Sequence, residues 1–152
     1  RRLFMLCQCI FPSSEVLEEH SVGNRVSNGS MLTVDVFVPL YSLALEYQGE
    51  HHYHEVYANT FTSMTFKARD VEKEEVLKQM GVTLVPIPYW WEGDLPHLAA
   101  TIMHFHKDID IEAGRNVKPL LEMPRTSKYL AIESSRNKNI MSPNQVGVMA
   151  NR

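Results

Sequence analysis

The sequence predicts an α/β domain whose mixed β-sheet is built around a β-hairpin and flanked by helices. Two apolar segments, residues 32–38 and 43–47, have the β-branched content or the period-two alternation of strands, and only four residues separate them. Residues 66–80 follow with helical spacing, and residues 82–89 form a further apolar segment typical of a buried strand. A strand, helix, strand succession usually leaves its two strands parallel, so the sheet is expected to be mixed.

The elements before the hairpin are less sharply defined. Residues 3–10 fit the end of a helix that Pro12 stops, and the start RRLFMLCQCIF also has the basic and apolar character of a signal peptide. Residues 15–22 fit a helix or a strand equally well, and residues 23–30 are a turn-rich loop.

The elements after the hairpin have clear end signals. Gly81 stands just past the helix of residues 66–80, where a glycine commonly ends a helix. The prolines of residues 82–89 predict that the far end of this strand lies at a sheet edge or leaves the sheet. Asp94 is predicted to cap a final helix over residues 95–107, which has apolar residues along one face.

Charge divides the chain of 152 residues into two parts. Residues 1–113 carry 8 Lys+Arg against 16 Asp+Glu, whereas residues 114–152 carry 7 against 2. The sequence therefore predicts one folded acidic domain, residues 1–113, and a basic, mostly disordered tail, residues 114–152, that can attract phosphate.

Other features bear on location and partners. No apolar run approaches the ~18 residues that cross a bilayer, so no membrane partner is expected. Cys7 and Cys9 are the only cysteines, and two residues apart they make a poor disulfide pair, which favours an intracellular compartment. The chain starts with Arg rather than Met, which indicates a fragment of a longer protein with other domains.

The hairpin brings two carboxylates together if it closes symmetrically about Leu40 and Tyr41. Asp35 and Glu46 then face each other on one side of the sheet, with their Cβ atoms roughly 5 Å apart. A divalent cation would offset the repulsion between them. Three alternatives stay open: one acid points to solvent, the pair shares a proton, or an odd loop length shifts the register by one residue.

The stretch DVFVPLYSLALEYQGEHHY, with the GVTLVPIPYWW segment after the helix, resembles the PD-(D/E)xK restriction-endonuclease-like superfamily. It is particularly similar to the branches of very-short-patch-repair-like endonucleases and RAP domains. The resemblance covers roughly residues 13–107 and implies a restriction-endonuclease-like three-layer core. It also implies a metal-dependent endonuclease that hydrolyses phosphodiester bonds of DNA or RNA.

The resemblance implies a metal site as well. Asp35 and Glu46 correspond to the ligands of Mg²⁺ or Mn²⁺, with the Tyr47 carbonyl as a third. Gln48 departs from the pattern, because many members carry lysine there and glutamine brings no positive charge. Lys73 on the following helix is the expected substitute, unless it forms a salt bridge with Asp70 instead.

Two further groups fit the rim of such a site. Among the histidines that follow the hairpin (His51, His52 and His54), His52 matches the family best and is expected to act as a general acid or to contact phosphate. The aromatic run Tyr89, Trp90 and Trp91 fits either stacking on bases or packing at the end of the last strand.

A second functional hypothesis is a catalytically inactive, RAP-like module that binds nucleic acid or protein. Gln48 and the formal charge of −8 on residues 1–113 favour this alternative, because nucleic-acid binding usually draws on Lys and Arg. The presence of both Asp35 and Glu46 favours catalysis.

Overall fold

The computed structural model describes residues 1–53, 60–125 and 129, without the side chains of residues 51 and 60–67. The chain divides into two compact units, Arg1–Leu121 and Glu122–Arg152. The first unit therefore includes residues 114–121, which lie beyond the expected end of the folded domain, and the Leu120 N–H donates to Thr101 Oγ1 at 3.0 Å. Most of the remaining expected tail lies outside the described residues.

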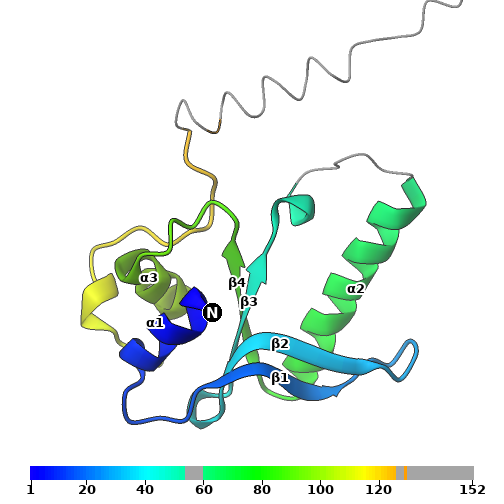
Figure 1. Ribbon diagram of the computed structural model, residues 1–152, viewed down its shortest axis with the longest axis horizontal. Helices are drawn as coiled ribbons and strands as arrows, with labels where there is room; N and C mark the ends of the chain where they lie inside the picture. Colours follow the sequence, from blue (N-terminus) through cyan, green and yellow to red (C-terminus); the bar gives the residue numbers. More distant parts are fainter. Residues whose placement is uncertain (54–59, 126–128, 130–152) are drawn as a thin grey trace, which may run out of the picture. The chain divides into compact units, whose positions relative to one another are not determined.

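A four-stranded mixed sheet forms the centre of the first unit, in the order β1-β2-β3-β4 (Figure 1). The strands are β1 (Leu17–Asn24), β2 (Met31–Val38), β3 (Leu43–Gln48) and β4 (Thr83–Pro88). β1 and β2 pair antiparallel, as do β2 and β3, whereas β3 and β4 are parallel. The predicted hairpin is therefore central in the sheet, and the parallel pairing expected across the following helix is confirmed.

The segment of residues 15–22, whose pattern fits a helix or a strand equally well, contributes to strand β1. Pairing with β2 gives its backbone N–H and C=O groups their hydrogen-bond partners, and this decides for the strand. β4 carries Pro86 and Pro88 and is an edge strand, as predicted. An edge strand tolerates proline because one side of its backbone needs no ladder partner.

The helices follow the predicted order. Helix α1 (Arg2–Ile10) precedes the sheet, α2 (Thr60–Gln79) connects β3 to β4, and α3 (Leu95–Phe105) follows β4. α2 begins before the predicted residue 66, in a Thr- and Ser-containing stretch whose helix propensity is weak. Asp94 caps α3 as predicted, since its Oδ1 accepts the His97 N–H at 3.0 Å.

Gly81 ends α2 as predicted. It has φ of +72°, its N–H donates to Lys78 O at 3.0 Å, and the Val82 N–H donates to Leu77 O at 2.9 Å. These two bonds form the Schellman motif, in which glycine accommodates the left-handed backbone without a Cβ clash. The motif turns the chain directly into β4.

Helices cover both faces of the sheet (Figure 1). One core, which includes Leu45 and Val85, lies against Leu3 and Cys7 of α1 and Leu98 and Ile102 of α3. A smaller core on the other face joins Val34 and Ala44 to Leu77 of α2. Within the described ranges, no helix is both long enough and apolar enough to cross a membrane.

Candidate active site

A pocket of about 170 Å³ lies between α2 and the ends of β3 and β4. Side chains of β3, η2 (Glu50–His52) and α2 contribute its polar wall, and Leu84, Pro86 and Phe105 contribute apolar atoms. The polar lining residues are Glu46, Gln48, His52, Asp70, Lys73 and Glu74. Four residues predicted for the site from the sequence, Glu46, Gln48, His52 and Lys73, thus meet in one pocket.

Glu46 and Lys73 form the central contact of this pocket. Lys73 Nζ donates to Glu46 Oε1 at 2.6 Å, and the two side chains are only 12% (Lys73) and 25% (Glu46) exposed. Strand alternation places Glu46 beside Ala44 on the α2 face, and Lys73 lies one helical turn before the buried Leu77. Strand β3 and helix α2 therefore direct the Glu46 carboxylate and the Lys73 ammonium into the same pocket.

Burial raises the pKa of Glu46 above its ordinary value of 4.5. The hydrogen bond and the charge of Lys73 lower it and offset part of this rise, the negative charge of Asp35 adds to it, and a hydrogen bond with the Asp35 backbone lowers it further. Glu46 Oε2 is also buried, and it accepts no hydrogen bond within the described part of the chain. Such an oxygen is costly unless something binds it.

Two polar contacts organise the rest of the pocket. His52 Nδ1–H donates to Asp70 Oδ2 at 2.7 Å, which orients the imidazole ring. The Tyr53 hydroxyl contacts Gln48 Oε1. Gln48 is thereby held on the wall of the pocket, where its amide can donate a hydrogen bond but supplies no charge.

Asp35 lies differently from the expectation. Its Oδ2 accepts the Tyr47 N–H at 2.6 Å, and its side chain lines another pocket, of about 450 Å³, together with Leu3 and Phe4 of α1. Asp35 and Glu46 therefore line separate pockets, and the expectation that alternation would set them directly opposite on one face is wrong.

The physical reason is a break in the alternation of β2. The hairpin register is the predicted one, with Val36 opposite Leu45 and Val38 opposite Leu43. However, Val34 packs on the α2 side and Val36 on the α1 and α3 side, although residues two apart in a regular strand share a face. Asp35 lies at this break and turns to the side of α1.

The contacts of Asp70 and Tyr53 were not predicted from the sequence. The signal for Asp70 was available, because it lies three residues before Lys73 on one helical stripe. Tyr53 offered none, since its contact depends on how the chain turns after η2. His54 and the side chain of His51 lie outside the described residues.

The aromatic run after β4 serves mainly in packing. Trp90 and Trp91 are buried, and the Trp91 Nε1–H donates to Asp94 O at 2.9 Å. The Tyr53 ring lies 4.5 Å from Trp90 and 5.7 Å from Tyr89, and it is 39% exposed. The exposed member of the cluster is thus Tyr53, which also contacts the pocket residue Gln48.

No family model, no curated protein and no solved structure matches the chain.

Proposed function

We propose that this protein has a restriction-endonuclease-like fold and hydrolyses nucleic-acid phosphodiester bonds with the help of Mg²⁺ or Mn²⁺. The observation that carries the proposal is the buried Glu46–Lys73 pair, in a pocket that Gln48 and His52 also line. A carboxylate and an ammonium held together next to hydrogen-bonding side chains suit a reaction in which negative charge develops on a phosphate.

Each residue of the pocket has a role in this proposal. Lys73 places positive charge where the phosphate oxygens gain negative charge, which Gln48 cannot do. Gln48 orients a water molecule or a phosphate oxygen through its amide. His52, held by Asp70, delivers a proton to the leaving oxygen as a general acid.

The residues fit a divalent cation only in part, because Asp35 and Glu46 line different pockets. The unbonded Glu46 Oε2 and the repulsion between Asp35 and Glu46 are both features that bound positive charge relieves. Among the described residues, no group of three His, Cys, Asp or Glu side chains is arranged to hold a metal ion. The ligands proposed from the family resemblance would be Asp35, Glu46 and the Tyr47 carbonyl. Mg²⁺ is commonly bound by one or two carboxylates and several waters. When bound, it would lower the pKa of a water molecule and neutralise phosphate charge.

A specific observation favours a second candidate, the inactive RAP-like module. Asp35 is engaged by the Tyr47 N–H and lines the α1-side pocket, so it does not share a pocket with Glu46. If the protein is such an inactive module, the surface around the Glu46–Lys73 pocket binds nucleic acid or a protein without cleaving it. For either function we place the protein in a reducing, intracellular compartment, because both of its cysteines are unpaired.

The test combines metal binding with cleavage. Calorimetry with Mg²⁺ and Mn²⁺ is run on the wild type and on Asp35→Asn, Glu46→Gln and Glu75→Gln. The last variant is the matched control, because Glu75 is exposed on α2 and does not line the pocket. The same samples are incubated with labelled single- and double-stranded DNA and RNA.

The nuclease proposal expects that Asp35→Asn and Glu46→Gln each abolish both metal binding and cleavage, while Glu75→Gln preserves both. Metal binding that survives both substitutions, or an absence of cleavage in the wild type with every substrate, would refute it. Tight nucleic-acid binding without cleavage would support the second candidate.

A further inference from the structure

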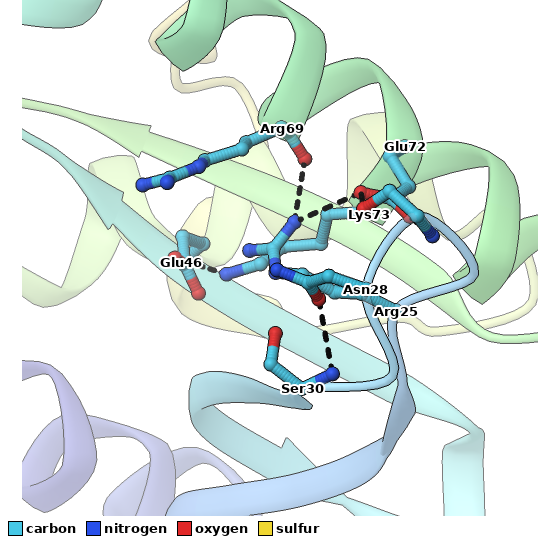
Figure 2. A network of polar contacts seen from close by, with 8 residues as sticks. Arg25, Asn28, Ser30, Glu46, Arg69, Glu72 and Lys73 are labelled. Carbon is cyan, nitrogen blue, oxygen red and sulfur yellow. Dashed lines mark hydrogen bonds and ion pairs between the residues drawn. The ribbon is translucent and has the colours of Figure 1, made fainter.

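The turn between β1 and β2 is fastened to the middle of α2 (Figure 2). Glu72 accepts the Ser27 N–H at 2.7 Å and the Ser27 hydroxyl at 2.9 Å. Arg25 Nη1 donates to the Arg69 carbonyl at 3.2 Å and lies 3.5 Å from Glu72 Oε2. The turn is thus held at the level of Glu72, the residue directly before Lys73.

This fastening orients Arg25 but uses little of its hydrogen-bonding capacity. The side chain is only 17% exposed, and all its contacts within the described ranges run through Nη1. Nε and both hydrogens of Nη2 have no acceptor there. A guanidinium that is fixed in place and keeps a planar pair of donors matches the geometry of a phosphate.

Arg69 adds a second cation on the same helix face. It lies four residues before Lys73, and residues at this spacing are neighbours on a helix. Its side chain is exposed and makes no hydrogen bond or ion pair within the described part of the chain. In Figure 2 the side chains of Arg25, Arg69 and Lys73 extend toward the side where Glu46 lies.

Three of the nearby acids are engaged by other residues, and a fourth, Glu74, lines the same pocket as Glu46. Glu72 is bound by Ser27 and Arg25, which lower its pKa, Asp70 binds His52, and Glu46 binds Lys73. The charge of Arg69 is therefore not compensated by the three engaged acids. Arg25, Arg69 and Lys73 are three of the eight Lys and Arg residues in residues 1–113, whose formal charge is −8.

We propose that Arg25 and Arg69 form a phosphate-binding fork that holds the backbone of a nucleic-acid strand beside the Glu46–Lys73 pocket. The inference rests on the proposed function for its ligand, but it concerns binding and not cleavage. The fork supplies the electrostatic attraction that the acidic domain otherwise lacks.

The test measures binding without cleavage, by fluorescence anisotropy of short labelled DNA and RNA oligonucleotides with EDTA, over a series of salt concentrations. Arg25→Gln and Arg69→Gln are each expected to weaken binding roughly tenfold at low salt. Each is also expected to reduce the slope of log affinity against log salt by about 0.7 for single strands and about 0.9 for duplexes.

Two further variants make the result specific. Lys78→Gln makes the same charge change on the last turn of α2, where Lys78 is exposed, and is expected to leave affinity and slope near the wild type. Glu72→Gln should weaken binding through Arg25, so it should add nothing in the Arg25→Gln background. Arg69 makes no side-chain contact that folding needs within the described residues, so Arg69→Gln tests the fork even if Arg25→Gln unfolds.

The outcomes separate the two proposals. Equal losses in Arg25→Gln, Arg69→Gln and Lys78→Gln, or no loss in any, would overturn the fork even if the wild type cleaves nucleic acid. Losses confined to the two fork variants would support the fork, even if the wild type cleaves nothing and the nuclease proposal fails. Absence of nucleic-acid binding by the wild type would overturn both.

Discussion

Removing the Lys73 ammonium should destabilise the protein through Glu46, and a double-mutant cycle measures by how much. Two unit charges about 4 Å apart attract by about 4 kcal/mol at an effective dielectric constant of ~20. Burial of both groups offsets much of this attraction by desolvation, and the exposed 25% of Glu46 allows some screening by solvent. We therefore expect a coupling energy of about 1–3 kcal/mol.

The assay is urea unfolding of the wild type, Lys73→Met, Glu46→Gln and the double variant at neutral pH. Lys73→Met alone should cost the most, since it leaves Glu46 charged and without its donor, and the double variant should recover part of that loss. A coupling energy below about 0.5 kcal/mol would refute the reasoning, because the pair would then behave as an exposed one.

The same variants should differ in how their free energy of unfolding changes with pH, and the direction of this change follows from the pKa of Glu46. The pKa of Glu46 is raised in the folded chain, so folding favours its protonated form. The stability that Glu46 contributes is fully present below its ordinary pKa of 4.5 and is lost as the pH rises through the raised value. The wild type should therefore lose stability relative to Glu46→Gln over this range, and Lys73→Met should extend the range upward. A pH-independent difference between wild type and Glu46→Gln would contradict this expectation.

Three further predictions concern single residues. Asp35→Ala should lower the free energy of unfolding by about 1 kcal/mol in urea, because the Tyr47 N–H loses its acceptor. Asp35→Asn keeps an acceptor and should cost less than about 0.5 kcal/mol. Equal costs would exclude the role of Asp35 as the acceptor of this hydrogen bond. Iodoacetamide should label exposed Cys9 but not Cys7 in the native protein, since burial raises the pKa of Cys7 to about 12; labelling of both by mass spectrometry would contradict this. Gly114→Ala should cost about 2 kcal/mol or more, because the new Cβ would lie 2.5 Å from the backbone of α3, and an unchanged thermal midpoint would refute the close packing.

The sequence by itself determined the elements whose signals are local. Alternation and β-branching defined β2 and β3, and the short connection between them set the register that pairs Val36 with Leu45. Gly81 and Asp94 marked helix ends through backbone and capping chemistry that depends on neighbouring residues alone. The helical stripe that carries Lys73 was visible for the same reason.

Only the tertiary structure decided which polar groups meet. The break in alternation at Asp35 cannot be inferred from a pattern that is regular on both sides of it, and it moved this carboxylate to a different pocket from Glu46. The contact of Lys73 with Glu46 spans 27 residues, and that of Arg25 with Glu72 spans 47. Such contacts depend on how α2 and the β1–β2 turn pack on the sheet, because packing selects among arrangements that the local sequence permits equally.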